Sequence, residues 1–304
     1  MIGEILALAS AFCFAFASVA IAKGAVQSSG ESGVLLSVLL TGLLAGLGWL
    51  ATGGAAPVAP GPAASGALAW AALGWFAASG LLATVLGRLS LFKSIEFAGV
   101  VRASTIRRLM PFLSLILAWV LLGEVISGLA GVGMGLIAGS FVLLWLENRK
   151  TLQGRRDPSQ VSLGIALGAL SALLYALSYV VRSIGLETVP DPFFGAFIGA
   201  LAALGYYVAA CLVSARYRAM VRDTLRHPNP WQIMAALCMS VGQILQFMAL
   251  TFTDVPTVTF INSVEVYIAA VLAVFVFRTE PMPSAALLAA TALATLGVVL
   301  VALG

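Results

Sequence analysis

The sequence predicts an all-α membrane protein with ten transmembrane helices that form two inverted five-helix repeats. Of the 304 residues, 61% are hydrophobic and only 9% are charged, and the mean hydropathy is +1.07. A soluble domain of this composition would expose far too much apolar surface. The apolar residues also fall into ten long stretches, and a bilayer core of about 30 Å needs about 20 such residues per helix. These runs are too long and too uniformly apolar for barrel strands.

The ten predicted spans follow one another through mostly short loops. The first span is too long for a removable signal peptide and lacks a small-residue cleavage pattern, so we count it as a helix. The spans are expected at residues 3–23, 34–53, 66–87, 97–122, 127–146, 161–184, 193–214, 230–252, 255–278 and 284–303. Because a unit with five crossings places its second copy upside down, we expect a first repeat over 1–150 and a second over 151–304.

Basic residues gather on one side of the predicted membrane. The loops after spans two, four and eight and both termini carry no Lys or Arg. Twelve basic residues lie in or beside the loops that follow the odd-numbered spans: Lys23, Arg88, Lys93, Arg149, Lys150, Arg155, Arg156, Arg216, Arg218, Arg222, Arg226 and Arg278. By the positive-inside rule these loops face the cytoplasm, and both termini face away from it. We expect a multi-pass protein of the cell (inner) membrane.

The two halves of the chain repeat each other weakly. Sliding residues 93–146 by 156 positions lays them over 249–302 without a gap, and Glu124 then meets Glu280. An offset of 161 aligns the early spans. Identities are few, so the repeat rests on the order of the spans and on a handful of placed residues.

One stretch carries a family resemblance. The run from Pro111 to Glu124, PFLSLILAWVLLGE, resembles the fourth-helix signature of the EamA-like branch of the drug/metabolite transporter superfamily. In the second half, Tyr267 stands where the Pro would be and Thr279-Glu280 replaces Gly-Glu. The resemblance implies a ten-helix monomer in which spans 1–4 and 6–9 surround a central cavity and spans 5 and 10 pack behind. It also implies cytoplasmic termini, which the basic loops of this chain contradict.

A ridge of glycines marks the fifth span. Gly131, Gly135 and Gly139 form a GxxxGxxxG pattern, and small residues of this kind let membrane helices approach closely. The ridge fits either a homodimer face or a contact between spans five and ten inside one chain. We expect the internal contact and a monomer.

Charged residues deep in the spans are the main functional signal. Arg107 and Arg108 lie about 15 Å into span four, and Glu265 lies ten residues into span nine. An ionised side chain at such depth costs at least about 2.5–3.5 kcal/mol, so it faces protein, water or substrate. One interpretation is a buried ion pair that fixes packing. The other is a binding site in which a guanidinium holds an anionic group and Glu265 exchanges a proton.

Neutral polar and aromatic residues complete the candidate substrate-binding set. Pairs spaced four apart share a helix face, and buried amides need hydrogen-bond partners. The candidates are Asn262, Ser263 and Tyr267 in span nine, Phe14 and Ser18 in span one, Tyr175 and Tyr179 in span six, and Gln243 and Gln246 in span eight. Glu124 and Glu280 fall at helix ends, where water or a backbone N–H can solvate them, and are expected to be structural.

These features predict a secondary active transporter of a small polar or amphipathic metabolite of anionic character. It would work by alternating access with proton coupling or exchange. The alternative is a non-transporting membrane scaffold or assembly subunit with the same fold, which would gain little from costly buried charge. We expect no enzyme activity, cofactor, metal or nucleic-acid partner, because the sequence has no phosphate loop, nucleophile triad or metal-ligand cluster. The expected partners are a small-molecule substrate and the lipid bilayer.

Overall fold

The computed structural model describes residues 1–24, 30–54, 66–98, 100–148, 158–227, 229–277 and 285–304, and within these ranges the chain contains helices and no strand. Seven helices are long and apolar enough to cross a membrane, and three shorter apolar helices bring the spanning columns to ten in the described ranges. The prediction of an all-α, multi-span membrane protein is therefore confirmed.

Four of the first five columns follow the predicted spans to within four residues at each end. The third column continues to Ala98, well beyond the predicted end at residue 87, and a π-helical segment, η1, interrupts it. In order, the columns are α1 (Ile2–Gly24), α2 (Gly30–Ala51), α3 with η1 and α4 (Gly66–Gly80, Leu81–Gly87 and Arg88–Ala98), α5 with α6 (Val100–Arg107 and Met110–Leu122), and α7 (Gly128–Asn148).

The second half repeats this order and adds one helix. Its columns are α8 (Pro158–Thr188), α9 (Pro192–Val213), α11 (Pro230–Ala249), α12 with α13 and η3 (Val255–Asn262, Glu265–Val271 and Leu272–Val276), and α14 (Ala285–Leu303). The added helix, α10 (Ala215–Arg226), occupies what the sequence predicts to be a loop. The four exposed arginines of α10 make this segment too polar to be predicted as a membrane span. Its inward residues Tyr217, Met220 and Val221 are apolar enough to pack against the bundle.

Short polar caps and prolines set the starts of several second-half helices. The Asp191 carboxylate accepts a hydrogen bond of 2.9 Å from the Phe194 N–H at the start of α9. The Asn229 side chain accepts one of 2.9 Å from the Trp231 N–H at the start of α11. In both helices a proline follows the cap, where its missing N–H leaves no donor unsatisfied.

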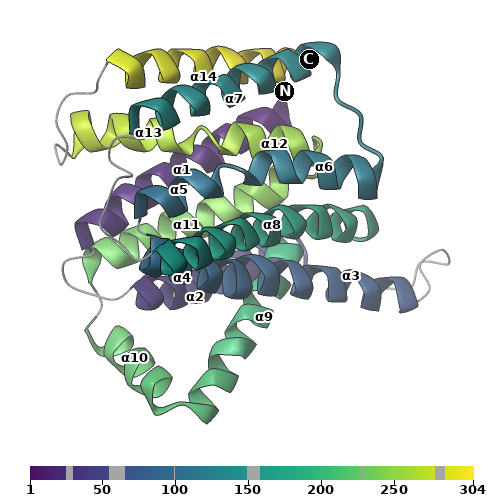
Figure 1. The fold of residues 1–304 in the computed structure, drawn as a ribbon. Helices are drawn as coiled ribbons and strands as arrows, with labels where there is room; N and C mark the ends of the chain where they lie inside the picture. The colour runs from purple at the N-terminus through teal and green to yellow at the C-terminus, as the bar shows by residue number, and fades with distance from the viewer. Residues whose placement is uncertain (25–29, 55–65, 99, 149–157, 228, 278–284) are drawn as a thin grey trace.

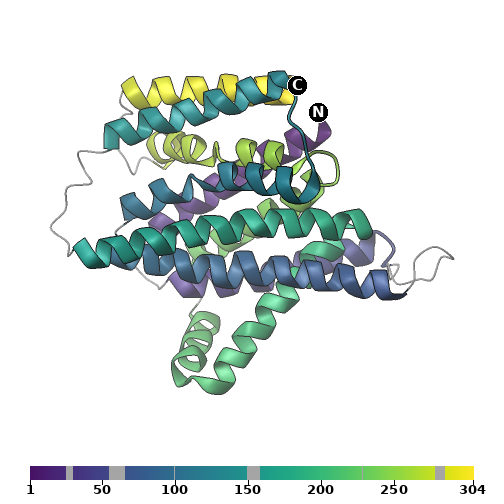
Figure 2. The ribbon, with the colours of Figure 1, turned by 45° about the vertical axis from the view of Figure 1, so that its right-hand side comes forward.

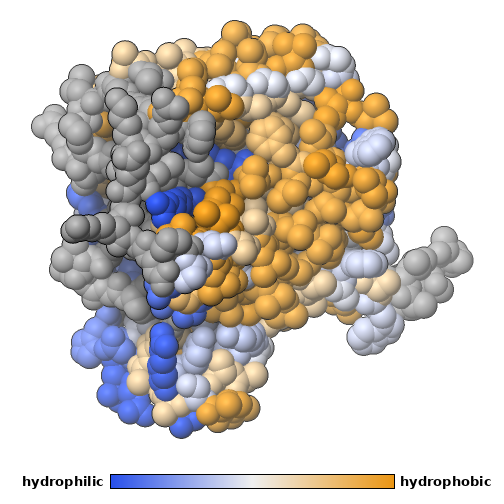
Figure 3. Space-filling view, in the orientation of Figure 1, coloured by the Kyte–Doolittle hydropathy of each residue, from blue (hydrophilic) through white to orange (hydrophobic). Residues whose placement is uncertain are grey.

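The two halves interleave. The helices that open them, α1 and α8, run in opposite directions through the bundle (Figures 1 and 2). Contacts between α1 and α11, α4 and α8, α2 and α9, and α6 and α12 join elements of different halves. Both termini lie at one end of the helices, and α10 lies toward the other. A broad hydrophobic band covers the middle of the face in Figure 3, and hydrophilic residues gather on the side of α10.

The fifth and tenth columns, α7 and α14, pack against each other along one side of the bundle. This confirms an internal contact between spans five and ten, but two of the three glycines predicted to make it, Gly131 and Gly135, do not. A Cβ added at Gly133 would lie 2.5 Å from the Gly297 carbonyl oxygen, whereas one at Gly135 would meet nothing within 4 Å. Gly131 is also exposed. At about 100° per residue Gly133 lies on nearly the opposite face of α7 from Gly131 and Gly135. Only Gly139 of the predicted ridge approaches α14, with an added Cβ 3.5 Å from Leu293, so the closest approach of the two helices is at Gly133.

Candidate functional site

Two columns are broken at corresponding depths. In the fourth column α5 ends at Arg107 and α6 begins at Met110, and in the ninth α12 ends at Asn262 and α13 begins at Glu265. Interrupted helices at equivalent positions of two inverted repeats are a strong structural indication of a binding site near the bilayer midplane.

The hydrogen bonds at the two breaks have the same pattern. The Leu109 N–H donates to the Ile106 carbonyl at 2.9 Å, and the Val264 N–H donates to the Ile261 carbonyl at 3.2 Å. Leu109 and Val264 are 155 positions apart in the sequence, and so are Ile106 and Ile261. At the break the two halves therefore align with a shift of 155 residues instead of 156. With this shift Glu265 corresponds to Met110 rather than to Leu109.

The charges at the breaks match the helix ends that carry them. Arg107 is the last residue of α5, where the helix dipole is negative, and Glu265 is the first of α13, where it is positive. Each charge is favourable at its own helix end. The backbone thus favours a cation and an anion, both half-buried, at the same level of the bundle.

Polar side chains surround these charges. Together with Arg107 and Glu265 they form what is here called the central cluster, whose other members are Tyr175, Tyr179, Arg182 and Gln246. The guanidinium carbon of Arg107 lies 5.2 Å from the centre of the Tyr175 ring. Arg107 and Glu265 are near enough for their charges to interact, and Tyr179 interacts with both. The structure therefore brings together Arg107 and Glu265, both half-buried, from the two broken columns.

Arg182 forms the deeper part of the central cluster. Its side chain is only 2% exposed, and its Nη1 donates a 3.0 Å hydrogen bond to Oε1 of Gln246. The amide nitrogen of Gln246 donates in turn to the hydroxyl of Tyr179. The guanidinium also lies 4.2 Å from the centre of the Phe247 ring, an arrangement that favours a cation. Its Nε has no hydrogen-bond partner among the described residues.

Arg182 was not among the predicted site residues. The sequence places it near the end of span six, predicted at residue 184, but α8 continues to Thr188. A usable signal was present, because Tyr175, Tyr179 and Arg182 follow one another at intervals of four and three residues and so share a helix face.

Arg108 turns away from the central cluster. Its guanidinium carbon lies 5.5 Å from the centre of the Phe141 ring, against α7. Tyr267 stacks on Phe141, with ring centres 6.2 Å apart, and donates a 2.7 Å hydrogen bond to the Ser140 hydroxyl. Arg107 and Arg108 are about 100° apart around the helix, so the two predicted arginines and Tyr267 do not form one site.

Asn262 lies at the break itself and is unusual among buried polar groups. It is 4% exposed, and neither atom of its side-chain amide has a hydrogen-bond partner among the described residues. Leaving such an amide unpaired costs about 1–3 kcal/mol. The hydroxyl of its neighbour Ser263 instead donates a hydrogen bond of 2.5 Å to the Phe260 carbonyl, within the same helical turn.

The remaining predicted site residues lie apart. Phe14 is half-buried beside Gly242 of α11, Gln243 is half-buried on the same helix, and Ser18 is exposed. The contacts of the described residues do not connect these three side chains to the central cluster.

Glu124 connects the fourth column to the ninth outside the membrane-spanning segments. Gly123 ends α6 with φ of +70°, a left-handed turn that favours glycine. The Glu124 carboxylate then accepts from the Val255 N–H at the start of α12, at 3.2 and 3.4 Å. The expectation that a backbone N–H solvates Glu124 is confirmed. Glu280 lies outside the described residues.

Burial, together with the negative charge of Asp254 and a smaller contribution from Glu187, raises the pKa of Glu124 to about 7, against the opposing hydrogen bond from Val255. The folded protein therefore holds a proton that the unfolded chain, with a carboxyl pKa of 4.5, releases. Ionisation between these values disfavours the folded state, so this carboxyl stabilises the fold less as the pH rises from about 4.5 to about 7.

Glu124→Gln is expected to remove this pH dependence and keep the helix cap, because the amide oxygen still accepts from Val255. We expect the melting temperature of the natural protein to fall relative to the variant between about pH 5 and about pH 8. Scanning fluorimetry of both proteins across that range measures the difference. A constant difference would contradict the assignment.

A family model decides the family of this chain. The model of the EamA-like transporter family matches residues 1–146 and 162–303, which is nearly the whole sequence. The chain belongs to the EamA-like transporter family. This EamA-like protein is thus a member of a family of membrane transporters of small molecules.

Structural comparison agrees on the fold of the EamA-like chain. A solved structure, titled only as the crystal structure of a protein, matches with a TM-score of 0.66 and 17% identity, over 99% of this chain and 96% of the other. At that identity the match shows the fold alone. No curated protein matches the sequence.

Proposed function

We propose that this chain is a secondary active transporter of a small metabolite with an anionic group, and that the central cluster binds that group. The observation that carries the proposal is an excess of positive charge with unsatisfied donors. The central cluster holds two guanidiniums, Arg107 and Arg182, and one carboxylate, Glu265, and Arg182 retains a buried Nε–H without a described partner. An anion would offset a charge that is costly in a low-dielectric interior.

The cluster offers the groups that a small polar ligand needs. A guanidinium binds two oxygens of a carboxylate or phosphate at once. At the break beside the cluster, the Asn262 amide, which has no partner among the described residues, supplies both a donor and an acceptor. Tyr175, Tyr179 and Phe247 supply aromatic surface around the arginines. This mixture favours a small amphipathic anion over a large hydrophilic one.

The transport cycle follows from the competition for Arg107. In the empty state Glu265 balances the charge of Arg107. An arriving anion takes that place, and Glu265 either accepts a proton or awaits a second anion, which gives proton coupling or exchange. The breaks at residues 108–109 and 263–264 let the half-helices move separately as one repeat rocks against the other.

The other interpretation is a structural ion pair in a protein that does not transport. A thermal-shift screen of the purified protein against anionic, cationic and zwitterionic metabolites separates the two, because a ligand that binds the folded state stabilises it. We expect anionic compounds alone to raise the melting temperature. A screen in which only cations stabilise the protein would refute the proposed cargo.

Both termini are proposed to face away from the cytoplasm in the cell membrane. With the three native cysteines replaced, an added cysteine at exposed Glu187 is expected to react with a membrane-impermeant maleimide in intact cells. One at exposed Arg226, on the basic side, is expected to react only after lysis. The reverse pattern would invert the orientation.

A further inference from the structure

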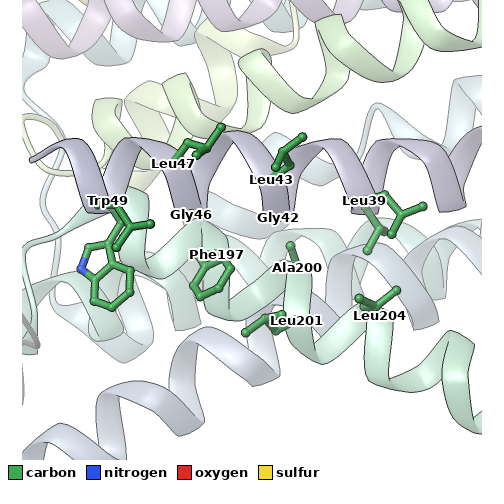
Figure 4. A pocket seen from close by; sticks show the side chains of 12 residues that line it. Leu39, Gly42, Leu43, Gly46, Leu47, Trp49, Phe197, Ala200, Leu201 and Leu204 are labelled. Atoms are coloured by element: carbon green, nitrogen blue, oxygen red, sulfur yellow. The ribbon is translucent and has the colours of Figure 1, made fainter. Parts of the chain in front are cut away.

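An apolar groove runs along the outer surface between α2 and α9 (Figure 4). It has a volume of about 410 Å³, and its walls are leucines, valine, alanine and aromatic rings. Gly42 and Gly46 on α2 contribute no side chain to its lining, and the ring of Phe197 on α9 fills the space beside Gly46, 3.1 Å from where a Cβ would stand. Leu43, Leu47 and Leu201 are exposed along it.

The groove has the length of a lipid tail. Its lining on α2 extends from Val38 to Leu50, which at 1.5 Å per residue is about 18 Å. Half of a bilayer core is about 15 Å thick. The groove is thus about 3 Å longer than half of the core, so one acyl chain fills most of it.

Polar groups join the lining at the end of the groove toward the basic side. One turn beyond Val38 and Leu204, a crevice begins whose walls combine Arg88 and four hydroxyl-bearing residues, Thr84, Tyr206, Tyr207 and Tyr217, with the apolar side chains of Val34, Val85, Leu89 and Phe92. Its volume is about 10 Å³, about the least that can hold one water molecule. A single phosphate oxygen can enter, while the rest of a headgroup would stay at the mouth.

Arg88 is the cation in this crevice. It is half-buried and donates one 3.1 Å hydrogen bond from Nη1 to the Ser37 hydroxyl. A guanidinium has five N–H donors, so the bond to Ser37 leaves others for a ligand. Ser37 is held by its own bond to the Val34 carbonyl, at 2.8 Å.

Helix α10 adds positive charge beside the crevice. Its residues Tyr217, Met220 and Val221 pack onto the side chains of α2, α4 and α9, and its four arginines, at positions 216, 218, 222 and 226, are all exposed. Arg218 Nη1 donates to the Cys211 carbonyl at 2.7 Å and so ties α10 to the end of α9. Basic amphipathic helices of this kind bind anionic membrane surfaces.

We propose that the α2–α9 groove and the Arg88 crevice form one binding site for an anionic phospholipid. The tail lies in the groove, one phosphate oxygen contacts Arg88, and Arg216 and Arg218, the neighbours of Tyr217 on α10, attract the negative headgroup. A second copy of the chain fits this surface poorly, because a symmetric contact would bring the α10 arginines of both copies together. The proposal does not depend on the identity of the transported substrate.

The test compares phosphatidylglycerol with phosphatidylcholine. Purified protein is mixed with each lipid in mild detergent, and retained lipid is measured by native mass spectrometry together with the melting temperature. We expect phosphatidylglycerol to be retained and to stabilise the protein. Arg88→Gln and Leu201→Trp, which fills the groove from an exposed position, are each expected to weaken retention by about tenfold.

Arg226→Gln is the matched control. Arg226 lies nine residues after Tyr217, about 180° around α10 from the packed side, so its loss removes one charge without touching the crevice. We expect retention to stay within about twofold of the natural protein. The site would be refuted by equal retention of phosphatidylcholine, or by equal effects of Arg88→Gln and Arg226→Gln. Inorganic phosphate alone reproducing the stabilisation would point to a free anion site. A dimer mass abolished by Leu201→Trp would make the groove a contact between copies.

Discussion

Arg107→Ala is expected to abolish the stabilisation that anionic ligands give to the natural protein. The substitution removes the guanidinium that interacts with Glu265 and Tyr175 in the central cluster, and with it the bidentate contact to an anion. Arg107→Lys is expected to restore little, because an ammonium has no planar fork. Thermal shift with the strongest anionic ligand measures both variants, and we expect at least about a tenfold loss of affinity.

The control is the next residue, Arg108, which points about 100° away from Arg107 around the helix. Arg108→Ala removes the same charge at the same depth, but Arg108 faces Phe141, so the response to anions is expected to persist. Glu265→Gln should preserve binding and change the pH dependence of transport in proteoliposomes. If the paired variant Arg107→Leu with Glu265→Leu regains both stability and transport, the two charges are only a structural pair.

Gly133→Leu is expected to be the most damaging single change in the fifth column. Even a Cβ at this position would approach the Gly297 carbonyl oxygen to 2.5 Å and the Val301 nitrogen to 2.8 Å. These are backbone atoms, which cannot rotate away, so α7 and α14 must separate. Overpacking of this kind costs about 1–3 kcal/mol or more, and we expect a large fall in melting temperature.

Gly135→Leu is the matched control for that substitution. It lies on the same helix, two residues away, and a Cβ there would meet nothing within 4 Å. We expect little change in melting temperature and in mass, measured by light scattering. A loss of stability at Gly135 equal to that at Gly133 would contradict the observed α7–α14 contact. A change of oligomeric mass at Gly135 alone would show that the exposed ridge is a contact between copies.

The class of the protein could be predicted from the sequence because hydropathy acts locally. Each of the ten apolar runs, such as 34–53, is long and apolar enough to favour the bilayer over water, independently of the segments around it. The additional helix α10 was not predicted, because Arg216, Arg218, Arg222 and Arg226 dominate its composition while only Tyr217, Met220 and Val221 pack. These three residues contact α2 and α9, and hydropathy along the chain does not reveal such contacts.

Chain periodicity placed Arg107 and Glu265 at matched depth, and their unfavourable desolvation identified them as candidates. The sequence could not show which arginine faces Glu265, because a shift of one residue turns a side chain by about 100°. The gap-free alignment shifted the second half by 156 residues, whereas the structure shows a shift of 155 at the break. Nor could it find that Arg182, from another helix, joins Gln246 and Tyr179, since such contacts link residues 64 and 67 positions apart.

The sequence by itself determined that this chain spans a membrane ten times and that a few charges lie deep within it, because the transfer of each segment into a bilayer depends mainly on its own composition. The tertiary structure alone decided which of these charges share a site, which glycine packs α7 against α14, and where an apolar groove remains open. Those outcomes depend on the rotation and close approach of helices from different parts of the chain. Helix packing decides these outcomes. Within a bilayer, packing depends on the shapes of neighbouring helices rather than on hydrophobicity.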